Sequence, residues 1–223
     1  MPRTRPSVPI LHRDDHLIVV SKPAGMLSVP TPGATGLALP GVLARSGIRA
    51  IPVHRLDREV SGAVLLALDE ETRDRLEAIF RERSIGKTYW ALAQGRVEPG
   101  RGTLRFPILE QGSFARVSAR GNEATTLYRT LERLPTTTVL EIDLVTGRYN
   151  QIRLHFAHAG FPLVGERKYA RGKDSPVRIR SRRVALHAWR LALVHPHTGE
   201  RLEVEAPLPE DLRSVLARAS GRE

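Results

Sequence analysis

Segments with strand-like patterns outnumber helix-like segments in this chain, and most of them are joined by short connections. Between residues 138 and 145, for example, apolar and acidic residues alternate, which is typical of a strand with one solvated face. Antiparallel strands can be joined by short turns, whereas parallel strands need long crossovers. The sequence therefore predicts an α+β fold with a large, mainly antiparallel sheet flanked by helices and loops. The predicted strands cover residues 16–20, 63–68, 87–97, 103–109, 114–119, 124–131, 138–145, 184–194 and 202–206.

Four helices are expected among these strands, the first a short one that starts over 41–44. Asp69 follows a continuous apolar run and has the chemistry of a helix N-cap, so we expect a helix with one apolar face over residues 70–83. Gly160 has the position of a residue that ends a helix, which predicts a helix over 150–159. The last helix is expected over 210–219.

Composition limits the domain organisation and the cellular setting. The 223 residues contain no proline- and serine-rich linker, so we expect a flexible arm over 1–8 and a single catalytic domain over 9–223. Because the chain has no cysteine, disulfides, thiolate metal sites and cysteine nucleophiles are excluded. The longest uninterrupted apolar run, residues 63–68, is far shorter than a membrane span, and the N-terminus has no pattern of a signal peptide. We expect a soluble cytoplasmic protein.

The charge of the chain indicates a polyanionic partner. It has 35 lysines and arginines against 24 acidic residues, a net charge of +11 at pH 7, which favours nucleic acid or an anionic membrane surface. Residues 167–183 contain eight basic residues and one acidic residue, a net +7, whereas residues 200–223 carry four basic and six acidic residues, a net −2. We expect the polyanion near 167–183. The alternative, a solvated basic loop, is less favoured because the whole chain also carries an excess of positive charge.

Ionisable residues are concentrated over 53–62, just before the buried strand predicted at 63–68. Polar loops next to a rigid strand are favoured places for active sites. Within this stretch Asp57 lies between Arg55 and Arg58. Taken alone, an aspartate in this position more often caps a turn or pairs with a neighbouring arginine, so both interpretations stay open.

A second polar stretch covers residues 147–156 and opens the helix predicted at 150–159. Arg153 falls near the N-terminal end of that helix, where the helix dipole disfavours a cation. A buried carboxylate from elsewhere in the chain would relieve this conflict. The alternative is an exposed arginine on a solvated helix face.

Several other chemistries lack their motifs. The histidine pairs 155/158 and 195/197 have no carboxylate at the spacing of a metal site, so we expect core or surface histidines instead. There is no phosphate-binding P-loop, no Gly-x-Gly-x-x-Gly after a strand, and no Gly-x-Ser-x-Gly nucleophile elbow.

Residues 54–62, HRLDREVSG, resemble the H-R-L-D-x-x-[ST]-S-G motif of the RluA-type pseudouridine synthases. The resemblance extends along nearly the whole chain. Where the family usually has Thr, His and Gly-Asp, this chain has Val60, Asn150 and Gly165–Glu166. The further similar fragments are HRDDHLIVVSKPAGMLSVP near the N-terminus, KTYWALAQG at 87–95, TGRYNQIRLHFAHAGFPLVGERKY at 146–169, and VALHAWRL, HPHTGE and EAPLP toward the C-terminus.

The resemblance implies an RNA-modifying isomerase that cleaves the glycosidic bond of a uridine, rotates the uracil and rejoins it through carbon 5. No net redox change or hydrolysis occurs, so no cofactor is implied. The implied substrate is a flipped-out uridine of transfer or ribosomal RNA, and we expect a monomer without an accessory N-terminal RNA-binding domain. By motif, the catalytic residues are Asp57, Tyr89 and Arg153, and the substrate-binding positions are Arg55, Arg58, Lys87, Arg148 and Gln151.

Each implied catalytic group has a physical reason. One carboxylate can attack the sugar or base, or assist bond cleavage. Burial under RNA would raise the pKa of Asp57, and an adjacent Arg153 would lower it by roughly 1–3 units. The ring of Tyr89 would stack on the flipped base. Two alternatives remain: a catalytically inactive RNA-binding protein of the same fold, and a glycosidase or nucleosidase, which normally needs a second carboxylate. Glu59 is the only acid close to Asp57 in sequence.

Overall fold

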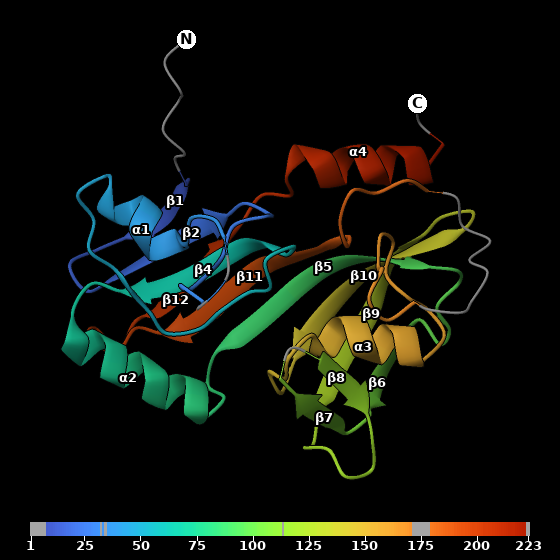
Figure 1. The fold of residues 1–223 in the computed structure, drawn as a ribbon, viewed down its shortest axis with the longest axis horizontal. Coiled ribbons are helices and arrows are strands. Elements are labelled where there is room, and N and C mark those ends of the chain that lie inside the picture. Colours follow the sequence, from blue (N-terminus) through green and yellow to red (C-terminus); the bar gives the residue numbers. More distant parts are fainter. Residues whose placement is uncertain (1–7, 32, 34, 113, 171–178, 222–223) are drawn as a thin grey trace. The chain divides into compact units, whose positions relative to one another are not determined.

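The computed structural model describes residues 8–31, 33, 35–112, 114–170 and 179–221. They divide into two compact units, the first within residues 1–87 and 188–207 and the second within 88–187 and 208–223 (Figure 1). Both units combine helices with mainly antiparallel strands, so the predicted α+β fold class is confirmed. The single domain over 9–223 stays a prediction. The arm expected over 1–8 lies outside the described residues except for Val8, whose side chain is buried.

In the first unit, β2 pairs antiparallel with β1 and with β4, and β3 also pairs with β4. Strand β12 pairs antiparallel with β11. Strand β4 is buried along its whole length, as its apolar run predicts. Helix α2 packs Leu76 into a core that includes Leu17 and Leu65. The elements are β1 (Ile10–Arg13), β2 (Leu17–Lys22), α1 (Leu39–Ala44), β3 (Ile51–Pro52), β4 (Ser61–Ala67), α2 (Glu70–Arg81), most of β11 (Leu186–Val194) and β12 (Arg201–Glu205).

In the second unit, β10 pairs antiparallel with β5 and β9, and β9 pairs with β6. Strands β7 and β8 form a separate hairpin. The single strand predicted over 103–109 is wrong, because the chain leaves β6 at Phe106–Pro107 and starts β7 at Ile108; proline has no N–H for a strand ladder. The elements are most of β5 (Gly86–Gln94), β6 (Arg101–Arg105), β7 (Ile108–Gln111), β8 (Phe114–Val117), β9 (Thr125–Arg133), β10 (Thr137–Leu144), α3 (Gln151–His158) and α4 (Glu210–Ala219).

The helices predicted from local sequence signals are present in the structure. Asp69 is the N-cap of α2, and its two carboxylate oxygens accept hydrogen bonds from the backbone N–H and the hydroxyl of Thr72, both at 2.7 Å. Helix α4 covers the predicted residues, and α3 ends before Gly160, which has a φ of +92°. These predictions rest on cap chemistry that acts within a few residues, so the sequence alone carries them.

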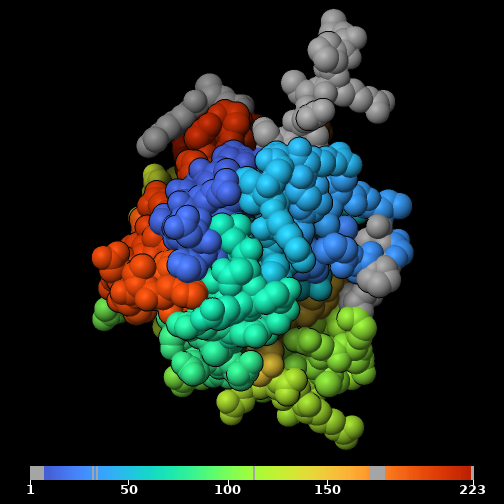
Figure 2. Space-filling view, turned by 90° about the vertical axis from the view of Figure 1, so that its left-hand side faces the viewer, coloured from blue at the N-terminus to red at the C-terminus, as the bar shows by residue number. Residues whose placement is uncertain are grey.

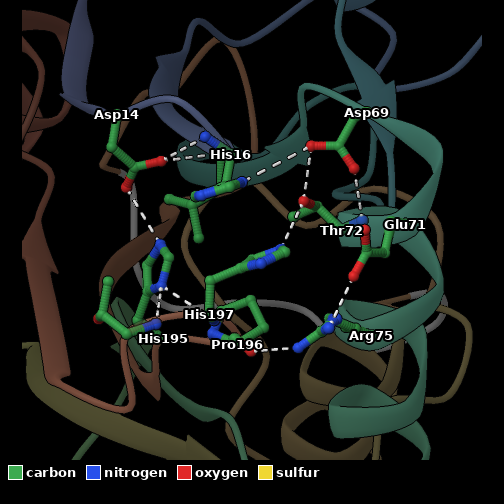
Figure 3. A network of polar contacts seen from close by, with 11 residues as sticks. Asp14, His16, Asp69, Glu71, Thr72, Arg75, His195, Pro196 and His197 are labelled. Carbon is green, nitrogen blue, oxygen red and sulfur yellow. Dashed lines mark hydrogen bonds and ion pairs between the residues drawn. The ribbon is translucent and has the colours of Figure 1, made fainter.

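Polar side chains join the β1–β2 turn, the start of α2 and the β11–β12 turn of the first unit (Figure 3). Asp14 accepts the backbone N–H groups of His16 and Leu17, both at 2.8 Å. Its second oxygen lies 3.2 Å from Nε2 of His195, whose Nδ1 accepts two backbone N–H groups and therefore leaves the ring proton on Nε2. The segment around the β11–β12 turn, orange in Figure 2, accordingly lies against the blue β1–β2 segment and the blue-green α2.

This network predicts an acid-dependent loss of stability. Partial burial tends to raise the pKa of Asp14, but the hydrogen bonds from Leu17, His12 and His16 lower it to about 2. A carboxylate with a depressed pKa stabilises the fold above its ordinary pKa and loses that contribution as pH falls through about 2. Asp14→Asn should therefore lower the free energy of unfolding at pH 7 by about 1–2 kcal/mol, and the difference should close between pH 4 and 2.

Denaturant unfolding at a series of pH values measures this difference. The neighbouring exposed Asp15 gives a matched control, since Asp15→Asn removes the same charge outside the network. A stability difference for Asp14→Asn that stays constant down to pH 2 would contradict the role assigned to its carboxylate.

Candidate active site

Asp57 lies in the loop between β3 and β4, and its neighbours in the chain are pinned to a second loop. Buried Ser28 donates its hydroxyl to the carbonyl of Leu56 at 2.9 Å and accepts the N–H of Leu56 at 3.0 Å. On the other side, Val60 donates its N–H to the carbonyl of Asp57 at 3.0 Å. The backbone that carries the partly buried Asp57 side chain is thus fixed on both sides.

The second loop is held by a buried ammonium group. Lys22 is 1% exposed, and its Nζ donates to the carbonyls of Pro23, Met26 and Arg58 at 3.1, 2.9 and 3.5 Å. Carbonyl oxygens of both loops therefore offset the cost of burying this charge. The sequence KPAG, which composition alone indicates as a turn, is the anchor of the Asp57 loop.

Gly25 completes this anchor. The N–H of Gly25 donates to the carbonyl of Arg58 at 2.7 Å, and Nε of Arg58 donates to the carbonyl of Gly25 at 3.0 Å. Gly62, which ends the polar motif, has a φ of +122°, and a Cβ there would lie 2.2 Å from the carbonyl oxygen of Ala188. Only glycine fits at that point of β4. Of the predicted substrate-binding residues, Arg55 and Arg58 are exposed on this loop.

His54 acts as a backbone acceptor. Its Nε2 accepts the N–H of Leu65 in β4 at 2.9 Å, and only an unprotonated nitrogen can do this. Burial and the charge of Lys87 lower the pKa of His54 to about 3, so the ring stays neutral. Burial and then the nearby charge of Arg83 lower the pKa of Lys87, whose Nζ lies 5.8 Å from the ring centroid of Phe80.

Tyr89 and Arg153 belong to the second unit, whereas Asp57 belongs to the first. Tyr89 lies on β5 opposite Ile142 of β10, and its side chain is 9% exposed. Arg153 is a buried residue of α3, so the alternative of an exposed arginine on a solvated face is wrong.

Arg153 has the buried carboxylate partner that its place in the helix requires, and that partner is Glu166. Nε and Nη2 of Arg153 donate to the two carboxylate oxygens of Glu166 at 2.6 and 2.9 Å. A paired carboxylate and guanidinium with two parallel hydrogen bonds is a strong arrangement. The roles of Asp57, Tyr89 and Arg153 in a reaction stay predictions.

Gln151 is buried and fully engaged by the protein. Its Oε1 accepts the hydroxyl of Thr146 and the N–H of Arg148, and its Nε2 donates to the carbonyl of Thr125 and the hydroxyl of Thr126. These contacts hold the segment before α3. Arg148 is partly buried, and its Nε donates to the carbonyl of Glu123 at 3.1 Å.

The basic segment predicted to face the polyanion is described only in part. Residues 171–178, which include Arg178, lie outside the described residues. Arg180 and Arg182 are exposed, but Arg183 is buried and paired with Asp211 of α4, with Nε–Oδ2 and Nη2–Oδ1 distances of 2.6 and 3.2 Å. Placing Arg183 on a surface for a polyanion is therefore wrong, because its charge is used inside the fold.

Across the ranges that the structure describes, no group of three or more His, Asp or Glu side chains has the arrangement of a metal site. His155 is buried and its Nε2 binds the carbonyl of Phe106 at 2.9 Å. No helix within those ranges is long and apolar enough to cross a membrane.

Two residues of this site escape reasoning from the sequence motifs. Lys22 and Ser28 hold the Asp57 loop from more than 27 positions upstream, with no local pattern linking them to it. The available signal is the family fragment around KPAG, which marks this segment as similar without giving its role. Glu166 is visible in the sequence only as a departure from the usual Gly-Asp.

Comparisons with known proteins give one consistent result. Residues 16–158 match the family model described as RNA pseudouridylate synthase. The chain is 38% identical over 213 residues to "Dual-specificity RNA pseudouridine synthase RluA" of Pasteurella multocida, covering 92% of this chain and 95% of the relative. It is 37% identical to "Ribosomal large subunit pseudouridine synthase D" of Nitrosomonas europaea, covering 93% of this chain but 64% of that relative.

A solved structure supports the same relationship. The chain matches "Human RNA Pseudouridylate Synthase Domain Containing 4" with a TM-score of 0.79 and 25% identity, covering 95% of this chain and 92% of the human chain. The likeness extends over most of both proteins and therefore concerns the fold as a whole, not one motif.

Proposed function

The chain belongs to the RNA pseudouridylate synthase family, a family of RNA-modifying isomerases, and from this premise we propose that it converts a specific uridine of an RNA into pseudouridine. The predicted family is thereby confirmed. The observation that carries the proposal is the HRLD loop, whose backbone is held on both sides of Asp57 by Ser28, Lys22 and Gly25. A reacting carboxylate must keep its geometry throughout catalysis, and this anchoring supports that requirement.

Asp57 is the central group of the proposed reaction. Its carboxylate attacks the uridine or assists cleavage of the glycosidic bond, and the detached uracil rejoins the ribose through carbon 5. The bond from the ribose to nitrogen 1 breaks and the bond to carbon 5 forms. The proton on carbon 5 leaves to solvent, and nitrogen 1 takes up a proton in its place. Because no electrons are gained or lost, the reaction requires no redox cofactor. Arg153 keeps the carboxylate anionic when RNA excludes water from the site.

Tyr89 stacks on the flipped uracil, and its hydroxyl takes part in removing the proton from carbon 5. The exposed Arg55 and Arg58, together with Lys87 and Arg148, are the proposed RNA ligands. Gln151 has four protein partners, so we reassign it from RNA binding to positioning the segment before α3.

Arg180 and Arg182, the exposed arginines of the basic segment 167–183, should contribute to RNA affinity and not to the chemical step. We expect Arg180→Gln with Arg182→Gln to weaken RNA binding while turnover at saturating RNA stays unchanged. If each side chain contacts one phosphate, the slope of log K against log salt should flatten by about 1.4–1.8. Binding measured at several salt concentrations gives this slope directly.

The control is the pair Arg201→Gln with Arg213→Gln, which removes two exposed charges from the acidic C-terminal region. It should leave the slope unchanged. An unaltered slope in the Arg180/Arg182 variant would show that RNA binds elsewhere.

The two relatives reported above are named for ribosomal RNA and for a dual specificity. We propose transfer or ribosomal RNA as the substrate, acted on by a cytoplasmic monomer without a cofactor. Pseudouridine mapping of total RNA from cells with and without the gene tests activity and target together. A site that disappears with the gene supports the proposal, and an unchanged map favours the catalytically inactive RNA-binding protein.

A further inference from the structure

Glu166 is a completely buried carboxylate with four hydrogen bonds. Its Oε2 accepts Nε of Arg153 at 2.6 Å, and its Oε1 accepts Nη2 of Arg153 at 2.9 Å. The same Oε1 also accepts the backbone N–H groups of Lys168 and Tyr169 at 2.8 and 3.2 Å. The side chains of Arg153 and Glu166 are 7% and 0% exposed. The carboxylate is therefore fixed to the backbone and in turn fixes the guanidinium.

The two bonds from Glu166 use one edge of the guanidinium. A planar guanidinium has five N–H donors, and Glu166 takes the Nε hydrogen and one Nη2 hydrogen. The donors that Glu166 does not use are the other Nη2 hydrogen and the two on Nη1. One hydrogen of Nη2 and one of Nη1 form the end edge of the guanidinium, which has the geometry to bind a second carboxylate or a phosphate oxygen.

A tyrosine supports the same guanidinium. The Cζ atom of Arg153 lies 5.8 Å from the ring centroid of Tyr169, and the Tyr169 hydroxyl accepts Nδ2 of Asn150 at 2.8 Å. Asn150 precedes α3 with a left-handed φ of +53°. Tyr169 is therefore tied to the N-terminal end of α3, and its backbone N–H is bound to Glu166.

We propose that Glu166 is a positioning residue for the reaction, which sets the orientation of Arg153 and through it the rate of turnover. The inference rests on the proposed function, because Arg153 acts there on the Asp57 carboxylate. Since the charges of Glu166 and Arg153 offset one another, the effect of Arg153 depends on where its second edge points more than on net charge. RNA affinity should depend little on this pair, because both side chains are buried.

Glu166→Gln tests this proposal by its pH profile. The amide keeps the shape but loses the second strong acceptor, so Arg153 is no longer held by two charge-assisted bonds. We expect kcat to fall by about 10–100-fold, the scale for groups that orient a functional side chain, with the RNA KM changed less than threefold. We also expect the acidic limb of kcat against pH to move to higher pH, because Asp57 loses a correctly placed cation.

The direction of that movement separates the explanations. Removing a negative charge without moving Arg153 would shift the acidic limb to lower pH, and a merely structural defect would lower kcat equally at every pH. Either result overturns the proposal. Glu141→Gln is the control, since it breaks another glutamate–arginine pair of the same unit, between buried Glu141 and exposed Arg129, and should leave the limb in place.

A folding check and a second variant at the same position complete the test. Circular dichroism and thermal unfolding establish that each variant folds. If Glu166→Gln unfolds, Glu166→Asp keeps the charge but shortens the side chain by one methylene, and it should shift the limb in the same direction by a smaller amount; an unshifted limb in that variant overturns the proposal. A wild-type protein that forms no pseudouridine refutes the proposed function, whereas an active wild type with unaltered Glu166 variants refutes only this inference.

Discussion

Replacing Asp57 by asparagine is expected to abolish pseudouridine formation while leaving the fold and RNA affinity intact. The amide is a far poorer nucleophile and base than the carboxylate, so turnover should fall at least about 10³-fold. The hydrogen bonds that anchor the loop run through the backbone carbonyl of Asp57 and through Leu56 and Arg58, and the substitution keeps them. Single-turnover formation of pseudouridine and RNA binding should be measured on the same preparation.

Glu59 provides the matched control for this experiment. It is an exposed acid two residues further along the same loop, so Glu59→Gln removes the same charge and should retain near-normal turnover. Equal losses in the two variants would indicate a general electrostatic effect of the loop. Normal turnover by Asp57→Asn would refute the assignment of the catalytic carboxylate.

Tyr89→Phe is expected to retain RNA affinity and lose turnover by about 10²-fold or more, the scale of a lost proton-transfer group. The stacking face stays in place because only the hydroxyl is removed. An intermediate formed before proton removal should accumulate in this variant. Tyr89→Ala should additionally weaken binding, because stacking contributes about 1–3 kcal/mol per base.

Tyr128 is a suitable control, since it lies in the same unit and is also 9% exposed. Tyr128→Phe should leave turnover nearly unchanged. If Tyr89→Phe reacts like the wild type while Tyr89→Ala does not, the ring is the working part and the hydroxyl has no role in proton transfer.

The parts of the fold that were predicted correctly depend on interactions close in sequence. Asp69 caps α2 through a residue three positions away, and β4 is buried as its continuous apolar run indicates. Helix α4 has the predicted bounds because its apolar residues repeat at helical spacing. The break at Phe106–Pro107 was missed because the apolar pattern continues across it, although Pro107 cannot donate to a strand ladder.

Sequence reasoning also did not identify the distant partners of two charged residues. Arg183 belongs to a basic stretch in the sequence, yet in the structure its guanidinium is paired with the carboxylate of Asp211, 28 positions away. Glu166 pairs with Arg153 across 13 positions and a helix end. Periodicity and charge counts do not record which opposite charge the folded chain brings near. The motif could therefore indicate Arg153 as important but not identify Glu166.

The most direct test of the central claim is tritium release from RNA labelled at carbon 5 of uridine, with the purified protein and transfer and ribosomal RNA transcripts. Pseudouridine formation replaces the carbon 5 hydrogen by a bond to the ribose, so each turnover must release one tritium to water. We expect release that matches the pseudouridine found after nuclease digestion, and none with Asp57→Asn. Absence of both tritium release and pseudouridine with the folded wild-type protein on every RNA, or equal release by Asp57→Asn, would contradict the account.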